Sequence, residues 1–505
     1  MSRITVDIDL NRVEGDLEFQ VDLEDGVVVD ARCVGTLYRG FEQIMIGRAP
    51  RDALVITPRV CGICGTAHLY AATLALEQIA HITPPAHAVQ VRNLCLMAET
   101  LQSDLRQSFL FFTPDFCNAI YAAHPLAAEL RDAFTPLKGS VVRGTLKATR
   151  DVLGIVALFG GQWPHSTYML PGGISQPANS RRILDSRGIL AAVRAWFEQA
   201  VIGGRLEEWM ALDSADALFR WQAAAAGRER SALGLFNRFS RDIGLHRLGR
   251  GTGHLLSYGV NPQPLSEARE LPAGFFNADT QQIETLDQSQ INEHVRHSWF
   301  LDYPGGRHPW EGETIPDHQP GSDRYTWAKA PRYGDKVVQT GPLAELRIAG
   351  EPLISDLLAR EGDNTWLRQF ARLRRAGWLI GAMSETLQAI KASMDQPHYI
   401  DPGIDIWPDG ESYGLVEAAR GGLGHWLRIR NGVIDKYQIV TPTAWNASPR
   451  DSAGRHGHWE QSIIGLPVPD PANPVDIGHI VRSHDPCLVC TVHFIGSQRK
   501  THFNV

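Results

Sequence analysis

The sequence contains no stretch of the roughly 18–20 apolar residues that a bilayer-spanning helix needs, and no internal repeat or low-complexity segment. Its first residues, MSRITVDIDL, lack the charged and then apolar pattern of a secretion signal. We therefore expect a protein that is made in the cytoplasm and that associates with a membrane only through partners.

The chain also lacks a strong charge of either sign. It has 49 basic and 56 acidic residues, for a net charge of −7. This balance gives no electrostatic basis for binding nucleic acid or an anionic membrane surface. The length of 505 residues and the hydrophobic content of 43% are sufficient for a large core, which could be divided into several parts.

Cysteine is scarce, with seven residues in the whole chain. Seven scattered cysteines are too few for a disulfide scaffold in a chain of this length. Cys33, Cys95 and Cys117 stand alone in apolar stretches and are expected to be buried thiols of the core. The other four form two C-x-x-C pairs.

Hydrophobic periodicity predicts an α+β fold that is mainly helical, with long core helices and a small N-terminal antiparallel sheet at 3–37. The stretch 296–342 is rich in Trp, Pro, Gly and His, and is expected to be an ordered irregular loop. Helices are expected at 41–48, 64–112 with a break at Pro84-Pro85, 143–158, 179–202, 205–224, 229–240, 363–392 and 472–482, and strands at 412–418, 425–430 and 434–440.

The predicted organisation has five parts. They are a β-rich region at 1–60, a helical body at 61–295, the irregular loop region at 296–345, a part at 346–493 with a helix, a small sheet and a metal-binding segment, and a tail at 494–505.

The two cysteine pairs lie near opposite ends of the sequence. Cys61 and Cys64 are followed by His68, and Cys487 and Cys490 are followed by His493. Two such pairs can bind one soft metal centre. The spacing alone leaves open a structural zinc site of four thiolates, an iron–sulfur cluster, and a redox metal site. A zinc clamp usually closes a short loop, whereas this site would close almost the whole chain, and the matched histidines suggest supporting residues around the ligands.

Further motifs surround these pairs, and together they give a family resemblance. The sequence resembles the large subunit of nickel–iron hydrogenases over essentially its full length, and is most similar to the cytoplasmic uptake and hydrogen-sensing branch. The motifs are Arg12-Val-Glu14-Gly15, Arg39-Gly40-Phe41-Glu42, the run at 59–68, Pro171-Gly-Gly173, Lys329-Ala-Pro-Arg-Tyr333, Gly341-Pro-Leu-Ala344, Arg420-Gly-Gly-Leu-Gly-His-Trp426, Pro442-Thr-Ala-Trp-Asn446 and the run at 485–493.

The resemblance implies a catalytic subunit that splits H2 heterolytically into protons and electrons. Cys61 and Cys487 would bind nickel alone, while Cys64 and Cys490 would bridge nickel and iron. The iron would carry carbon monoxide and cyanide ligands. Soft thiolates suit nickel and low-spin iron better than hard cations.

The resemblance also gives roles to residues around the metals. Arg420 would lie over their open side as a base or an electrostatic partner, although Arg resists deprotonation. Thr443 would hydrogen-bond a cyanide, and Leu423 and Pro442 would line an apolar pocket for diatomic molecules. Glu14 would be the first proton acceptor beside a nickel-bound thiolate. Without the resemblance, Arg420 could be an ordinary structural residue and Glu14 could pair with Arg12.

A separate magnesium site is implied as well. Glu42, His493 and the backbone carbonyl of Ile439 would be its protein ligands. His68 and Asp485 are expected to support the cysteines. The sequence departs from the family where a His-Asp-His run is common, since Ser103 occupies the position of its Asp and Asp104 follows. A second departure is Ala419 in place of the common Pro before Arg420.

The implied partners follow from the same resemblance. An iron–sulfur small subunit would receive the electrons in an obligate heterodimer, with a larger oligomer as a further option and with subunit contacts near the N-terminal sheet and residues 59–68. Nickel-insertion factors and an endopeptidase that cuts after His493 would mature the chain. A regulatory H2 sensor with the same site is the alternative function. The quinone-site subunit of respiratory complex I is a non-redox relative, but it lacks the four cysteines that this chain has.

Overall fold

The computed structural model describes residues 3–9, 12, 17–319 and 321–487. Glu14, Cys490, His493 and the tail 494–505 lie outside these residues. Among the described helices, none has the length and apolarity that crossing a bilayer requires.

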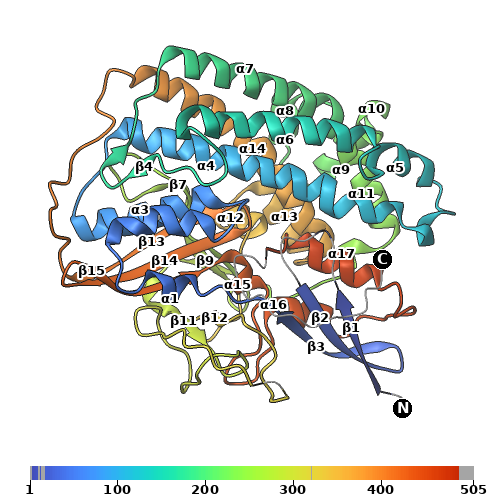
Figure 1. Cartoon of the computed structure of the whole chain (residues 1–505). Coiled ribbons are helices and arrows are strands. Elements are labelled where there is room, and N and C mark those ends of the chain that lie inside the picture. Colours follow the sequence, from blue (N-terminus) through green and yellow to red (C-terminus); the bar gives the residue numbers. More distant parts are fainter. Residues whose placement is uncertain (1–2, 10–11, 13–16, 320, 488–505) are drawn as a thin grey trace.

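The N-terminal region forms the small antiparallel sheet that the alternating pattern predicts, with strand order β1-β2-β3. Phe19 and Val21 on the middle strand face inward and pack against Trp459 and Ile480 of two C-terminal helices. The first and last parts of the chain therefore share one small core (Figure 1). The strands are β1 Arg3–Asp9, β2 Leu17–Glu24 and β3 Val27–Gly35.

The helical body begins directly after Cys64. Helix α3 ends at His81, which adopts a left-handed conformation, and Pro84-Pro85 separates it from α4, as predicted. Helix α4 packs against α6 and α14 in the layer at the top of Figure 1. The elements up to residue 242 are α1 Phe41–Met45, α2 Ala53–Ile56, α3 Gly65–Ala80, α4 Ala86–Arg106, α5 Ala127–Phe134, α6 Ser140–Gly160, β4 Met169–Leu170, β5 Gly173–Ile174, α7 Ser180–Trp196, α8 Leu206–Met210, α9 Ala215–Ala223, α10 Ala226–Glu229 and α11 Ala232–Asp242.

Several helices differ from the sequence-based expectation. The single helix predicted for 205–224 is wrong, because the chain breaks before Ser214, whose hydroxyl caps α9 by accepting a hydrogen bond from Ala217 N. Helices α12 and α13 were not predicted, although Pro342 and Pro352 at their first positions are a recognised start signal. Helix α5 was missed as well.

The segment from 255 to 333 carries only short strands, but its loops are packed. The rings of Phe300 and Trp327 pack edge to face within a buried aromatic cluster, with 5.5 Å between their centroids. The stretch 296–342, for which an ordered irregular loop is predicted, also contains the short strand β12 at Ala330–Tyr333. The strands are β6 Leu255–Ser257, β7 Val260–Pro262, β8 Arg269–Leu271, β9 Gly274–Asn277, β10 Gln282–Glu284, β11 Ile291–His294 and β12 Ala330–Tyr333.

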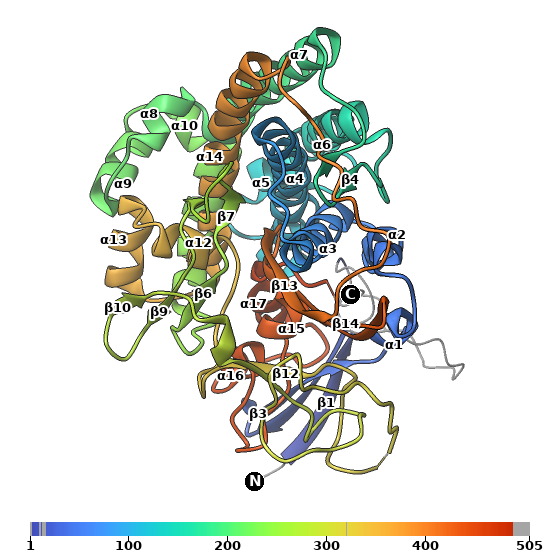
Figure 2. The same cartoon turned by 90° about the vertical axis from the view of Figure 1, so that its left-hand side faces the viewer.

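The longest of the described helices, α14 Thr365–Ala392, lies beside α4 (Figure 2). It is capped by Asn364, whose side chain accepts a hydrogen bond from Leu367 N. It is unusual because it buries Arg368, Arg372, Arg374 and Arg375. A guanidinium is buried only when acceptors surround it, and each of these four has them. The neighbouring helices are α12 Pro342–Ile348 and α13 Pro352–Glu361.

A three-stranded antiparallel sheet of order β13-β14-β15 lies beneath α3 (Figure 1). The helix backbone approaches β13 closely at Gly414, where an added Cβ would lie 1.9 Å from the carbonyl oxygen of Ala71. This contact fixes the distance between α3, which follows Cys64, and the strand that leads to Arg420. The remaining elements are β13 Gly410–Ala418, β14 Gly421–Arg430, β15 Val433–Val440, α15 Pro442–Asn446, α16 His458–Ile463 and α17 Val475–Ser483.

The Gly414 contact gives a stability prediction. Gly414→Ala should lower the free energy of unfolding by about 1–3 kcal/mol or more, because the methyl group forces the helix and the strand apart. Gly188→Ala is the matched control, since a Cβ at that helical position meets nothing within 4 Å, and it should raise stability by about 0.5–1 kcal/mol. Thermal unfolding measures both. Equal stability of Gly414→Ala and the unmodified chain would show that the contact is not a constraint.

Candidate metal centre

One cysteine of each pair meets the other in the interior. Cys61, in the loop before α3, and Cys487, after α17, bring their sulfur atoms to 3.5 Å from each other. Both side chains are fully buried, and Cys64 is only 4% exposed. The three thiols are not disulfide-bonded. Two thiolates bound to one metal ion at about 2.3 Å each have sulfurs about 3.3–3.8 Å apart, so the observed separation fits a shared metal.

The described residues hold three of the four cysteines. Within them, no group of three His, Cys, Asp or Glu side chains forms a metal cage. The fourth thiol, Cys490, lies outside the described residues. The donor set is thus soft and buried, and its completion depends on Cys490.

The start of α3, directly after Cys64, is hydrogen-bonded to a buried carboxyl group. Glu99 on α4 accepts hydrogen bonds from Thr66 N at 3.0 Å and Ala67 N at 3.2 Å, in the first turn of α3. Trp163 Nε1 donates to the same carboxyl group at 2.9 Å. Burial raises the pKa of Glu99 to about 7, against the lowering effect of these hydrogen bonds. Glu99 therefore fixes the direction in which α3 leaves Cys64.

His68, one turn into α3, is the start of a buried chain of hydrogen bonds. Its Nδ1 lies 3.0 Å from His425 Nε2, and His425 Nδ1 lies 2.8 Å from the hydroxyl of Tyr437. Burial lowers the pKa of His68 to about 4, so the ring is neutral, although the charge of Cys61 opposes this shift. His68 Nε2 has no hydrogen-bond partner among the described residues, which leaves one buried polar atom available to a group bound at the cysteines.

Arg420 follows β13 and is held by the residues just before Cys487. Its Nε lies 3.1 Å from both the backbone oxygen and a carboxylate oxygen of Asp485. Burial lowers the pKa of Arg420. The negative charges of Asp485 and the cysteines raise it by more than burial lowers it, so the net shift of the pKa is upward. The side chain is therefore a permanent cation, and its Nη1 has no partner among the described residues.

Among the other residues expected around the metals, Thr443 contacts a cysteine directly, whereas Pro442, Leu423 and Ser103 are buried. Thr443 accepts a hydrogen bond from Cys487 N through Oγ1 at 3.2 Å. Pro442 and Leu423 are buried at the start of α15 and on β14. Ser103 is buried in α4. Its neighbour Asp104 pairs with Arg375 at 2.6 Å, so Asp485 is the carboxylate that the described structure places on Arg420.

A family profile described as nickel-dependent hydrogenase matches residues 39–136 and 238–493. The chain belongs to the nickel-dependent hydrogenase family. The matched stretches contain all four cysteines, Arg420 and Glu42.

Individual hydrogenases agree with this assignment. The large subunit of the periplasmic [NiFeSe] hydrogenase of Desulfomicrobium baculatum is 31% identical, with 98% of this chain and 96% of that protein covered. The uptake hydrogenase large subunit of Rhodobacter capsulatus is 29% identical over 98% of this chain and 96% of the relative.

The solved structures agree as well. One of the H2-activated D. baculatum enzyme has a TM-score of 0.83 at 30% identity, over 97% of this chain and 100% of that one. The predicted fold, that of a nickel–iron hydrogenase large subunit, is confirmed, and the protein is a hydrogenase and hence an oxidoreductase.

Family membership decides between the metals that the spacing left open. The cofactor metals of a member of this family are nickel and iron, and the zinc and separate iron–sulfur interpretations no longer apply. The relative from D. baculatum is named for selenium as well as nickel and iron, whereas this sequence has cysteine at all four positions of its two pairs.

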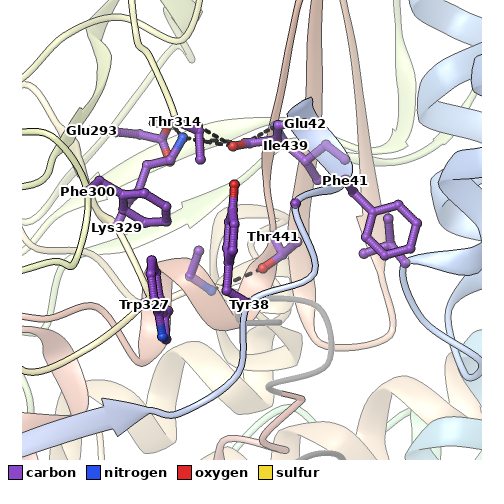
Figure 3. A pocket seen from close by; sticks show the side chains of 13 residues that line it. Tyr38, Phe41, Glu42, Glu293, Phe300, Thr314, Trp327, Lys329, Ile439 and Thr441 are labelled. Carbon is purple, nitrogen blue, oxygen red and sulfur yellow. Dashed lines mark hydrogen bonds and ion pairs between the residues drawn. The ribbon is translucent and has the colours of Figure 1, made fainter. Parts of the chain in front are cut away.

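A second polar site lies at a small pocket next to α1 (Figure 3). Glu42 accepts a hydrogen bond from Ile439 N at 2.9 Å, and Thr314 donates to the same carboxylate. The ammonium group of Lys329 lies 3.3 Å from Glu42 and 3.1 Å from Glu293. The structure thus brings together Glu42 and Ile439, two of the three predicted magnesium ligands, and adds a cation beside them. His493 lies outside the described residues.

The sequence interpretation missed several residues that support the site. His425 was quoted only as part of the 420–426 motif, and no local signal marked Tyr437, Glu99 or Arg375. These residues come from four different elements, so only the fold brings them to the centre.

The raised pKa of Glu99 predicts a pH dependence of stability. A carboxyl group with a pKa of 4.5 when unfolded and about 7 when folded favours the folded state while it is protonated. That contribution, about 3 kcal/mol for a shift of this size, is present below pH 4.5 and is lost as the pH rises to about 7.

The measurement is chemical unfolding across this pH range. Glu99→Gln should lack this component of the slope, because its amide does not titrate. Glu385→Gln, at an exposed position on α14, should keep the slope of the unmodified chain. Identical slopes for Glu99→Gln and the unmodified chain would contradict the assignment.

Proposed function

We propose that this protein is the catalytic large subunit of an uptake hydrogenase, which cleaves H2 heterolytically to two protons and two electrons. The observation that carries the proposal is the pair of buried cysteines from opposite ends of the chain, 3.5 Å apart, with the guanidinium group of Arg420 fixed beside them. When bound, a nickel–iron centre supplies the redox change. Carbon monoxide and cyanide on the iron, with Cys64 and Cys490 as bridging ligands, are part of this proposal.

Arg420 acts in this scheme as a cation and hydrogen-bond donor. Two contacts with Asp485 hold its Nε, so the rest of the guanidinium group keeps one orientation. A guanidinium group resists deprotonation, and the charges around Arg420 strengthen that resistance. Its role is therefore to stabilise negative charge at the centre, while another group takes the proton.

Glu14 is the proposed proton acceptor. It lies outside the described residues, and the Arg12-Val-Glu14-Gly15 motif carries this assignment. A carboxylate within hydrogen-bond reach of a thiol can take its proton on one oxygen and pass it outward. Glu14→Gln should leave nickel in place but prevent exchange of H2 with solvent deuterium. Exchange at the full rate would contradict this role.

Magnesium is proposed at the pocket beside α1. Glu42, the carbonyl group of Ile439 and His493 would be its protein ligands. A carboxylate and a carbonyl oxygen suit a hard cation. Lys329 occupies the same carboxylate in the structure, so the ammonium group and the metal ion would share the charge of Glu42.

The electrons require a partner, and we propose an iron–sulfur small subunit. Apart from the two pairs, the chain has only three scattered cysteines, of which Cys33 and Cys95 are buried and Cys117 is half-buried. The surface near the Cys61 loop carries exposed apolar side chains at Ile44, Ile46 and Val55, with exposed fractions of 41%, 48% and 47%. A group of exposed apolar residues is typical of an interface.

The distinction between enzyme and sensor rests on the C-terminal tail. We propose that an endopeptidase removes residues 494–505 once nickel has been inserted, so that His493 ends the mature chain. Mass spectrometry of the mature protein tests this: a terminus at His493 supports the enzyme, whereas retention of all 505 residues supports the regulatory H2 sensor. We also propose that the protein is located in the cytoplasm.

The role of Arg420 gives a sharp kinetic prediction. Arg420→Lys keeps a positive charge but loses the planar fork of donors, so H2 oxidation should fall about 100-fold. Nickel content, measured by elemental analysis, should not change. Arg428→Lys is the control, because Arg428 lies farther along the same sheet and pairs with Asp435. Full activity of Arg420→Lys would contradict the proposed role.

The partner surface can be tested separately. Ile46→Glu and Val55→Glu should each weaken small-subunit binding at least about tenfold, because a charge would be buried at the centre of the interface. Leu184→Glu is the control, since Leu184 is 67% exposed on α7, away from the Cys61 loop. Co-purification of the tagged chains measures the effect. Unchanged binding in both variants would place the partner elsewhere.

A further inference from the structure

Two carboxyl groups that the proposed reaction does not use lie next to each other in the core. Glu345 is on α12, and Glu417 is near the end of β13, three residues before Arg420. They are 1% and 4% exposed. They lie within hydrogen-bonding reach of each other, so that each carboxyl group shifts the pKa of the other.

Each carboxyl group has donors on one of its oxygens only. Glu417 Oε1 accepts from Ser257 Oγ at 3.0 Å and from Tyr258 N at 2.5 Å. Glu345 Oε1 accepts from Arg375 Nη1. The second oxygen of each group, Oε2, receives no donor from another residue that the structure describes. These are the oxygens left for the bond between the two groups.

A hydrogen bond between two carboxyl groups needs a proton, because two carboxylates have no donor. Two like charges in contact in a buried site also repel each other strongly. The ion pairs lead to the same conclusion: Arg375 pairs with Asp104 and Glu345, whereas Glu417 forms no ion pair among the described residues.

The proton belongs on Glu417. Glu345 contacts a guanidinium group, which favours its carboxylate form, whereas the other donors to Glu417 are neutral. We propose that Glu417 holds a proton that it shares with Glu345, and that this protonated pair is a positioning element for Arg420. The second half of the proposal rests on the function proposed above.

The connection to Arg420 runs through Arg375 and the backbone. Arg375 Nη2 donates to the carbonyl oxygen of Ala419, the residue before Arg420. On the other side, Gly421 packs so tightly that an added Cβ would lie 2.6 Å from Gly341 N, at the start of the helix that carries Glu345. A second negative charge in the pair would attract Arg375 and displace α12. Arg375 and α12 are the two contacts that hold the backbone at residues 419–421.

Other charged or titratable groups act on the pair from every side. Burial raises the pKa of Glu417 well above its usual range, and the charge of Glu345 raises it further. Arg269 lies nearby, but directs Nη2 to the carbonyl oxygen of Leu415. The surrounding groups are Asp104 on α4, Arg372 and Arg375 on α14, Arg269 on β8, Tyr258 after β6, and Arg420 with Asp485.

Infrared spectroscopy of the nickel-loaded complex tests the shared proton. The C=O stretching band of a protonated carboxylic acid lies above the amide bands and shifts in D2O. We expect one such band to disappear in Glu417→Gln. It should also disappear in Glu345→Gln, because removing one negative charge lets Glu417 ionise. Glu385→Gln, which is exposed, should keep it. A band that persists in Glu417→Gln overturns the proposal, and one that persists in Glu345→Gln shows that the proton is not shared.

Stability against pH gives a second readout that does not depend on the metals. A raised folded pKa makes the unmodified chain lose stability as the pH rises, whereas Glu417→Gln, whose amide imitates the protonated group, should not titrate. The difference between the melting temperature of Glu417→Gln and that of the unmodified chain should therefore grow as the pH rises above about 4.3, the ordinary pKa of a glutamate. A difference that stays constant as the pH rises overturns the proposal.

The positioning role is tested by the infrared bands of the diatomic ligands on iron. They should keep their positions in Glu417→Gln and shift in Glu345→Gln, where Arg375 loses a charged partner and the turn before Arg420 relaxes. Unshifted bands in Glu345→Gln would overturn the positioning role. If the proposed hydrogenase chemistry were itself wrong, these ligand bands would be missing from every variant, while the carboxylic band and the pH dependence would still report on the pair.

Discussion

The contact between Cys61 and Cys487 is the constraint on which the rest of the structure depends. The two residues come from opposite ends of the chain, and their sulfurs lie 3.5 Å apart in a fully buried position. Thiolates that close repel each other unless a metal ion neutralises them. The fold must therefore hold both ends rigidly, and it does so through shared packing: the N-terminal sheet, α16 and α17 form one core, while α3 and β13 meet at the glycine contact of residue 414.

Rigidity around the centre comes from buried polar groups as much as from apolar packing. Glu99 fixes the first turn of α3, Asp485 fixes Arg420, and the arginines of α14 connect these regions to the core. Each group is matched by specific partners, because an unmatched charge at such depth would be costly. The pair of Glu345 and Glu417 follows the same rule, since a proton takes the place of the ion-pair partner that Glu417 lacks among the described residues. Polar networks of this kind fix one arrangement of side chains more narrowly than apolar contacts do.

The candidate site could be predicted from the sequence where its residues are part of local motifs. The cysteines, Arg420, Glu42 and Thr443 all stand in short runs with recognisable neighbours, and the family comparison agrees with the overall interpretation. The prediction of one helix for 205–224 failed because α8 ends at Met210 and a second helix begins after the capping Ser214. Helix α12 was missed despite its leading proline. Glu99, Tyr437 and Arg375 left no local signal, since each acts through residues that are distant in the sequence.

The sequence by itself determined the kind of metal ligand in this protein: two cysteine pairs supply soft sulfur donors. Residue types and their spacing carry that information, because the preference of a metal depends on the atoms that bind it. The tertiary structure alone decided how those residues are held. It placed Asp485 rather than Asp104 on Arg420, joined His68 to His425, and brought Glu345 against Glu417. Such pairings depend on how α4, α12, α14 and β13 pack against one another. The hydrophobic periodicity of one segment does not predict which other segment it will contact.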